Sequence, residues 1–212
     1  MLPFTLAAIT AALGWLIYRH TQGHRAPILI GLTCVLLIGL GAIEWRWRSM
    51  QDHYSDVARD FLNRPEVHVK CQRATGAMFN VFNRQGYVAY NADGSLPTKA
   101  DLTWETCRSI RSWVSQKGKD VDEDTLIAVH VLSHEIQHLA GHRSEAVTEC
   151  YAIQHDATIA RLLGATSVEG EALAALYYER YYPRMRSNYR TADCAPGGAL
   201  DLNPDTPAWP TG

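Results

Sequence analysis

Residues 122–164 read DEDTLIAVHVLSHEIQHLAGHRSEAVTECYAIQHDATIARLLG. The acidic run Asp122–Asp124 suits the positive end of a helix dipole, and Gly141 is a natural C-terminal cap for the helix that follows. A second helix is expected from its cap at Ser144 to a stop at Gly164. The stretch therefore predicts two consecutive helices that fold back on each other in an antiparallel pair.

The first of these helices contains the pattern HExxH. His134 and His138 project from one helix face, four positions apart, close enough to hold one metal ion. Glu135 neighbours that face and can reach a metal-activated water as general base. Two incidental histidines on an ordinary helix are the alternative, but the motif lies in a well-formed helix with apolar residues on both sides. We therefore predict metal-assisted hydrolysis with zinc as the cofactor.

A zinc site with an open position needs a third protein ligand. The metzincin pattern would place a histidine at position 144, which is Ser, so that class is excluded. Glu145 and Glu149 follow on the second helix. If the helices fold back about residues 141–143, Glu149 lies level with position 135, between the two histidines. Glu149 is therefore the predicted third ligand, and Glu145 is the alternative ligand or a group that orients a ligand histidine.

Two parts of this sequence resemble known proteins. HEIQH followed by Glu149-Cys150-Tyr151-Ala152 resembles a minimal gluzincin, in which a Glu on the helix after HExxH completes the zinc site. The run HEIQHLAGHRSEAVTECYAIQ also resembles a group of small membrane-anchored HExxH proteins of actinobacteria, as does the tail from Tyr189 to Leu202. The resemblance is best over residues 126–202 and weak over residues 66–120.

The resemblance implies a bacterial membrane protein with one zinc ion per chain. It implies His134, His138 and a Glu as ligands and Glu135 as the catalytic residue. The resemblance says nothing of the substrate; a peptide or protein substrate is expected from the predicted metal-assisted hydrolysis.

Hydrolysis of a peptide bond also needs a donor to the developing oxyanion. Spacing does not single one out, because tyrosines at helical steps are more typical of packing than of catalysis. His130, one turn before His134, is interpreted as structural. The possible donors are His142, His155, Tyr177, Tyr178, Tyr181, Tyr182 and Tyr189.

Four cysteines lie in the part of the chain that follows the apolar front end. Two disulfides in an oxidising compartment fit a domain of this size. Of three possible pairings, Cys71–Cys107 and Cys150–Cys194 are favoured because each joins neighbouring segments. Four reduced thiols in a cytosolic domain are the alternative. Without a CxxC pair, a cysteine-rich zinc site is not expected.

The front of the chain predicts a transmembrane hairpin. Two uncharged apolar runs, about residues 2–18 and 27–43, are each long enough to cross a bilayer. Trp15 and Tyr18 end the first run, and Trp45 and Trp47 follow the second, as at membrane interfaces. A cleavable signal peptide fits less well because the start carries no Lys or Arg. Positive-inside counting is a near tie, and the cysteines favour an extracytoplasmic domain.

The remaining segments complete an α+β fold. Short strands at 67–71, 78–82 and 87–90 predict a small antiparallel sheet. A helix to about Val114 with a cap at Asp101 or Thr103, and another from Thr166 to Tyr182, make the domain mainly helical. The predicted divisions are a hairpin at 1–45, a helical linker at 46–64, a zincin-like domain at 65–202 and a loosely ordered tail at 203–212.

Charge excludes one class of partner and leaves another open. With 20 Lys and Arg against 22 Asp and Glu, the chain lacks the basic excess of a nucleic-acid-binding protein. The lipid bilayer and a peptide or protein substrate are the expected partners, and the oligomeric state stays open. The alternative function is a non-catalytic, disulfide-stapled cell-envelope binding or scaffold domain with a structural or vestigial metal site.

Overall fold

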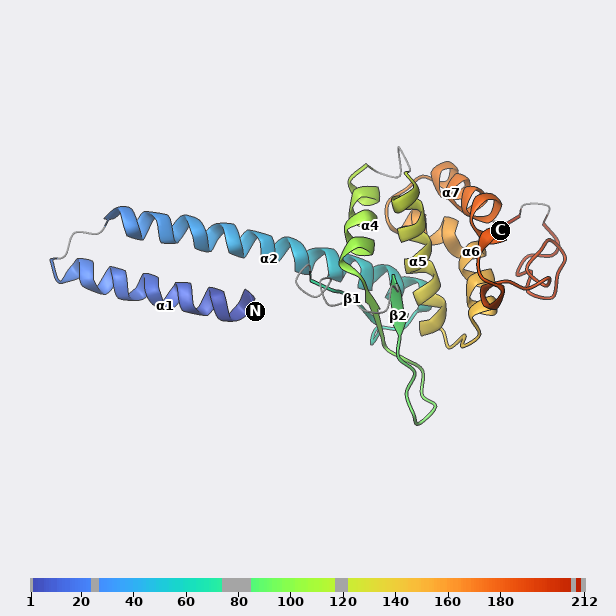
Figure 1. Ribbon diagram of the computed structural model, residues 1–212, viewed down its shortest axis with the longest axis horizontal. Coiled ribbons are helices and arrows are strands. Elements are labelled where there is room, and N and C mark those ends of the chain that lie inside the picture. Colours follow the sequence, from blue (N-terminus) through green and yellow to red (C-terminus); the bar gives the residue numbers. More distant parts are fainter. Residues whose placement is uncertain (1, 24–26, 74–84, 117–121, 207–208, 211–212) are drawn as a thin grey trace. The chain divides into compact units, whose positions relative to one another are not determined.

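A computed structural model describes residues 2–23, 27–73, 85–116, 122–206 and 209–210 of the chain (Figure 1). The chain divides into two compact units, Met1–Met50 and Gln51–Gly212. Each unit is described by itself. The second unit contains the HExxH motif and both disulfides.

The first unit contains α1 (Leu2–Thr21) and the start of α2 (Pro27–Leu62). Within the described ranges, α2 is the one helix long and apolar enough to cross a membrane. The prediction of two spans is therefore corrected to one. Residues 2–18 are helical, but α1 is the shorter helix and its last turn carries the basic residues Arg19 and His20. One such helix fits either an anchor or a signal sequence.

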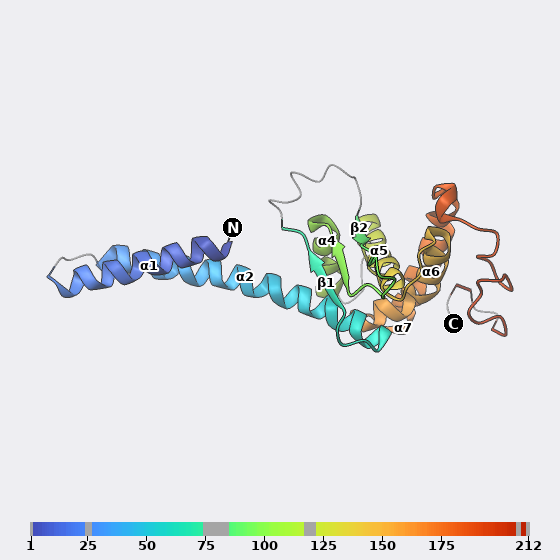
Figure 2. The same ribbon diagram turned by 90° about the horizontal axis from the view of Figure 1, so that it is seen from below.

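The second unit is built around four helices: α4 (Trp104–Gln116), α5 (Glu123–Leu139), α6 (Glu145–Leu162) and α7 (Ser167–Arg180). As Figures 1 and 2 show, α5 lies between α4 and α6, and α7 packs on α6. Gly170 permits the close approach of α7, because a Cβ there would lie 2.8 Å from the carbonyl oxygen of Ala157 on α6. Two short 3-10 turns, η1 (Tyr182–Arg184) and η2 (Ser187–Tyr189), follow α7.

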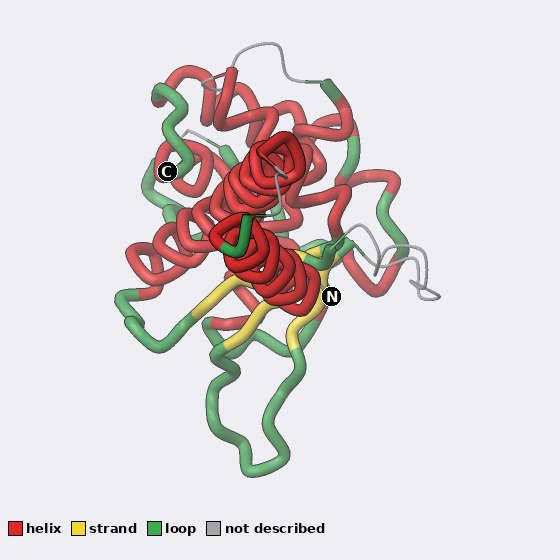
Figure 3. The backbone as a smooth tube through the Cα atoms, turned by 90° about the vertical axis from the view of Figure 1, so that its left-hand side faces the viewer, coloured by secondary structure: helices red, strands yellow, loops and turns green. Residues whose placement is uncertain are grey.

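A small mixed sheet accompanies these helices (yellow in Figure 3). Its strands β1 (His68–Cys71), β3 (Lys99–Leu102) and β2 (Gly86–Val88) lie in that order. β1 runs parallel to β3, whereas β2 runs antiparallel to it, so the prediction of a wholly antiparallel sheet is wrong. The central strand β3 was not predicted, because the charged Lys99 and Asp101 do not give the apolar pattern expected of a central strand. The predicted strand at 78–82 lies outside the described residues.

Local sequence signals account for the helix ends. The Asp122 side chain accepts a hydrogen bond from the backbone N–H of Thr125 at the start of α5. Thr103, rather than Asp101, caps α4 by accepting from the N–H of Thr106. Glycines with positive φ, such as Gly141 at +104°, follow α5 and α6. Thr166 and Glu169 form the predicted capping box of α7.

The core of the second unit lies where the end of α2, the sheet, α4 and α5 meet. The Tyr54 hydroxyl of α2 donates to the carbonyl of Cys107 on α4 at 3.0 Å. The largest side chains buried there include Trp113, Ile110, Leu102, Leu126, Leu132, Ile136 and Leu139. Burial of such side chains contributes about 1.5–3 kcal/mol each to folding. This packing fixes α5 and with it the HExxH motif.

Two disulfides link this core to its surroundings. Cys71 of β1 pairs with Cys107 of α4, and Cys150 of α6 pairs with Cys194 of the C-terminal segment. The favoured pairing is thereby confirmed, and Cys34 in α2 is free. Disulfides persist in oxidising compartments. Together with the apolar helix near the N-terminus, they favour an extracytoplasmic location for the second unit.

Candidate metal centre

Helix α5 carries the HExxH motif through a buried part of the second unit. It packs against α4, α6, α7 and the strands β2 and β3, and every residue from Leu132 to Leu139 is buried. The exposed fractions of His134, Glu135 and His138 are 8%, 4% and 6%. Because buried polar and charged groups are costly unless they are paired, their partners indicate what the site can do.

Three side chains converge on one point beside the motif, and we call them the outer cluster. The Nε2 atoms of His134 and His138 lie 3.1 Å apart. The Oε2 atom of Glu145 lies 3.1 Å from the former and 3.3 Å from the latter. Ligands bound tetrahedrally to zinc at about 2.0–2.1 Å would be separated by about 3.3–3.4 Å. The donor set and its nearly equilateral spacing could hold a metal ion.

Groups from two other segments hold Nδ1 of His138, the ring nitrogen that does not belong to the outer cluster. It lies 2.7 Å from the carbonyl oxygen of His142 and 2.8 Å from the hydroxyl of Tyr90, which precedes β3. The Tyr90 hydroxyl also donates to the carbonyl of His142. An N–H at Nδ1 that donates to these oxygens leaves the lone pair of Nε2 directed at the cluster.

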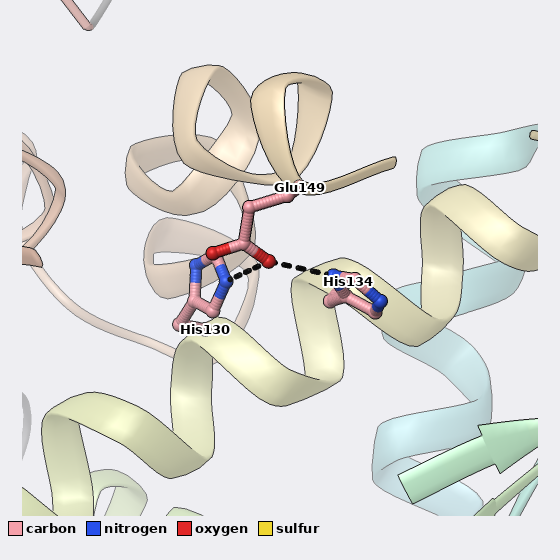
Figure 4. Close-up of side chains that lie close together, drawn as sticks. All are labelled: His130, His134 and Glu149. Atoms are coloured by element: carbon pink, nitrogen blue, oxygen red, sulfur yellow. Dashed lines mark hydrogen bonds and ion pairs between the residues drawn. The ribbon is translucent and has the colours of Figure 1, made fainter. Parts of the chain in front are cut away.

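A second group, the inner cluster, lies deeper in the domain and shares His134. Figure 4 shows the Glu149 carboxylate of α6 between the rings of His130 and His134 on α5. Its Oε2 atom lies 2.9 Å from Nδ1 of His134 and 3.2 Å from Nε2 of His130. Only 1% of the Glu149 side chain is exposed. Both groups of three side chains have the composition of a metal site.

Two further residues complete the surroundings of the inner cluster. Asp156 of α6 places Oδ2 2.8 Å from Nδ1 of His130. The Tyr177 hydroxyl of α7 donates to Oε1 of Glu149 at 2.8 Å, and its ring stacks on His130 with centroids 3.5 Å apart. Each carboxylate oxygen of Glu149 thus has a partner inside the protein.

The two carboxylates of the clusters keep their charge. Hydrogen bonds from His134 and His138 lower the pKa of Glu145 to about 2. Burial works to raise the pKa of Glu149, but His130 and His134 hold it well below its usual range. Anionic oxygen atoms that face imidazole nitrogens attract protons or a cation.

The pKa values of His134 and His130 are raised, whereas those of the two carboxylates are lowered. Burial disfavours the charged form of His134, but hydrogen bonds to Glu145 and Glu149 raise its pKa to about 9. Burial likewise opposes the charged form of His130, whereas Asp156 and Glu149 raise its pKa to about 10. Without a metal, protons therefore neutralise part of the negative charge in this region, and a cation at the outer cluster must displace one from His134.

Glu135 points toward the sheet and packs against Gly86 of β2. A Cβ at Gly86 would lie 2.7 Å from Oε1, 2.8 Å from Cγ and 3.0 Å from Cδ of Glu135. Only glycine therefore fits at this position without moving the carboxylate. β2 is an edge strand in the order of the described sheet, so Glu135 lies at the margin of the sheet.

The structure brings together some of the predicted ligands and separates others. His134, His138 and Glu145 form one group, whereas Glu149 meets His134 from the opposite side of its ring and is grouped with His130. Counting levels along two antiparallel helices brought both Glu residues near the histidines. It did not reveal which ring nitrogen of His134 faces each of them, because this depends on side-chain rotation.

Sequence reasoning did not find Asp156 and Tyr90, and it interpreted His130 as structural. His130 and Asp156 had a usable signal: His130 stands four positions before His134, and Asp156 stands seven after Glu149 on the same helix face. Tyr90 had none, because a loop tyrosine far along the chain meets His138 only through the fold.

The possible oxyanion donors lie in different surroundings. The Tyr189 ring has its centroid 5.8 Å from that of His134, and Tyr177 is used by Glu149. His155 packs edge-on against Phe61, with centroids 4.8 Å apart. Tyr189 is thus the one of these three that lies beside a residue of the outer cluster.

No family model, curated protein or solved structure matches this chain. Buried His and Glu clusters in a mainly helical domain form a possible metal site, whose ion is not identified by these groups alone.

Proposed function

We propose that the chain is a membrane-anchored, zinc-dependent peptidase of the gluzincin type. The observation that carries the proposal is the convergence of two Nε2 atoms and one carboxylate oxygen, 3.1–3.3 Å apart, beside the glutamate of an HExxH motif. In this proposal His134, His138 and Glu145 hold the zinc ion. Glu145 thus takes the place that the sequence reasoning gave to Glu149.

The surroundings of the two clusters favour the outer one for catalysis. A catalytic zinc site must keep a position open for water and substrate. The Glu145 side chain is 38% exposed, whereas those of Glu149 and His130 are 1% and 3% exposed. A substrate can therefore approach the outer cluster, and the inner cluster is closed to it.

The chemistry follows from the residues around this opening. A zinc ion held there would polarise a substrate carbonyl and lower the pKa of a water molecule to about 7. Glu135 is the general base that takes the proton of the attacking water and delivers it to the leaving amine. The Tyr90 hydroxyl, whose pKa is raised to about 12 mainly by burial, keeps its proton and holds His138.

An extended peptide is the substrate class that suits the margin of the site. Among the described strands, β2 forms the edge of the sheet, and its Gly86 contacts Glu135. Edge strands bind extended peptides through backbone hydrogen bonds. Anchorage through α2 would hold the domain near the bilayer surface, where membrane-associated or envelope polypeptides are within reach.

The zinc content of the full chain tests this proposal. We expect one zinc ion per chain after purification in detergent without chelator, measured by elemental analysis, and release of peptides from denatured casein. Glu145→Gln should remove the zinc because it takes one of three ligands. Glu171→Gln, an exposed carboxylate of α7, is the matched control and should keep it.

Three results would contradict the proposal in different ways. A folded chain that takes up no zinc even when supplied with it would exclude the metal site. Full zinc content in Glu145→Gln, with loss in Glu149→Gln, would return the third ligand to Glu149. Zinc binding without any hydrolysis of casein or of a peptide library would instead support the non-catalytic binding or scaffold domain.

A methyl group at Gly86 is expected to damage catalysis without removing the metal. In Gly86→Ala the new Cβ collides with three atoms of the Glu135 side chain, so the carboxylate must move. A misplacement of about 1 Å typically costs on the order of 10²-fold in rate. We expect a loss of that order in kcat and an unchanged zinc content. Gly31→Ala, where a Cβ meets nothing within 4 Å, is the control, and full activity of Gly86→Ala would refute the placement of Glu135.

A further inference from the structure

We propose that Asp156, His130 and Glu149 form a buried chain of hydrogen bonds and one ion pair that positions His134 and strengthens its hold on the metal. This inference rests on the proposed function, because it assigns a role to residues behind the proposed zinc site. None of the three is a ligand in that site. They act through the ring of His134 and are therefore positioning residues.

The chain can be followed atom by atom. Asp156 Oδ2 lies 2.8 Å from His130 Nδ1, and the opposite nitrogen of His130 lies 3.2 Å from Glu149 Oε2. The same Oε2 atom lies 2.9 Å from His134 Nδ1. Nε2 of His134 then faces the outer cluster. Each residue of this series is thus joined to the next by one short contact, and the four residues alternate between α6 and α5.

This geometry favours a chain of hydrogen bonds and one ion pair over a second metal site. In the outer cluster three ligand atoms lie mutually 3.1–3.3 Å apart around one point. In the inner cluster a single oxygen of Glu149 lies between two rings whose centroids are 6.2 Å apart. One carboxylate oxygen that is hydrogen-bonded to His134 and ion-paired with His130 links the two rings without a shared metal ion. A metal here would also compete with the outer cluster for His134.

The chain is held rigid on its far sides. Tyr177 stacks on His130 and donates to Oε1 of Glu149, so that Oε2 remains for the two histidines. The exposed fractions of Asp156, Glu149 and His130 are 0%, 1% and 2%. Two carboxylates buried this deeply are costly to a fold that uses them only for packing. Their arrangement behind a ligand histidine gives them a function.

The expected effect is on the metal rather than on folding alone. An acceptor on Nδ1 fixes the tautomer and orientation of a ligand histidine and raises its basicity, and loss of such a partner typically weakens metal binding about 10–100-fold. Asp156 and His130 act on that acceptor, since they hold Glu149 in place. Removal of either should therefore loosen His134 although neither touches the outer cluster.

The test is zinc affinity of the full chain in detergent, measured by competition with a chromophoric chelator. We expect Asp156→Asn and His130→Gln each to raise the zinc Kd about 10–100-fold. The double variant should be little weaker than either single one, because both break the same chain. The visible spectrum of the Co²⁺-loaded variants should also change, as the ring of His134 changes its orientation. A purely structural role would not produce that change.

Gln154→Leu is the matched control. Gln154 is a buried polar residue on α6 whose hydrogen bonds go to Cys150 on the same helix and to Leu200 and Leu202 in the C-terminal segment. It should lower thermal stability while keeping the wild-type Kd and Co²⁺ spectrum.

Three outcomes would overturn the inference or its basis. Asp156→Asn preserves side-chain size. If this variant folds and its zinc Kd stays within about threefold of wild type, Asp156 does not position His134 and the inference is refuted. Two zinc ions per wild-type chain, one of them lost in His130→Gln, would make the inner cluster a metal site instead. A wild-type chain that binds no zinc would refute the proposed function itself, and this result is distinguishable from the other two.

Discussion

Replacement of Glu135 by Gln is expected to abolish most peptide hydrolysis and to leave the zinc in place. Glutamine has almost the same shape but cannot accept the proton of the attacking water. General bases contribute about 10²–10⁴-fold to the rate of such reactions. Glu135 is 4% exposed and packs against Gly86, so the isosteric change avoids a cavity. Peptide release from casein and zinc content of the same preparations are the two measurements.

The comparison with Glu145→Gln gives this experiment its meaning. Both variants should be inactive, but only Glu145→Gln should be poor in zinc. An active Glu135→Gln protein would show that hydrolysis, if present, uses another base. Zinc content and peptide release, measured together, therefore distinguish the predicted metal ligand from the predicted general base.

The parts of the fold that follow local rules were accessible from the sequence. Asp122 and Gly141 define the ends of α5, and the Thr166–Glu169 box defines the start of α7, because each acts within one turn of its own helix. Ser144 precedes α6 as predicted but makes no side-chain capping hydrogen bond. The disulfide pairing also followed, since the favoured pairs join neighbouring segments.

The parts that depend on distant contacts were not accessible. β3 carries Lys99 and Asp101 and becomes the central strand only because β1 and β2 pair with its two edges. The four-residue spacing was sufficient to predict that His134 and His138 lie on one face of α5. The choice between Glu145 and Glu149 depends on the rotation of the His134 ring, which no spacing rule contains.

The two clusters together explain why so many ionisable groups are buried in one helix pair. His134 faces Glu145 through one nitrogen and Glu149 through the other. This one side chain therefore belongs to both the half-exposed outer cluster and the buried inner cluster. A structural metal site has no use for the glutamate of HExxH. That residue and the opening beside Glu145 favour an enzyme, and the inner chain favours a site in which the ligand orientation is controlled.

Loss of the Cys150–Cys194 disulfide is expected to lower the free energy of unfolding by about 4 kcal/mol. The bond closes a loop between cysteines 44 positions apart, and a cross-link of that span removes about this much conformational freedom from the unfolded chain. The segment it closes includes Tyr189, whose ring lies beside that of His134. Changing both cysteines to Ser should therefore also loosen the wall of the metal site.

Thermal melting of the full chain in detergent, followed by near-ultraviolet circular dichroism, measures this effect. For a chain of this size we expect a fall in Tm of roughly 10 °C. Cys34→Ser is the control, because Cys34 is free and lies in α2. Loss of the Cys71–Cys107 bond, with a separation of 36, should cost about as much on chain entropy alone. A difference between the two double variants would therefore measure the native contacts that each bond holds, and an unchanged Tm for Cys150→Ser/Cys194→Ser would refute the stabilising role of this disulfide.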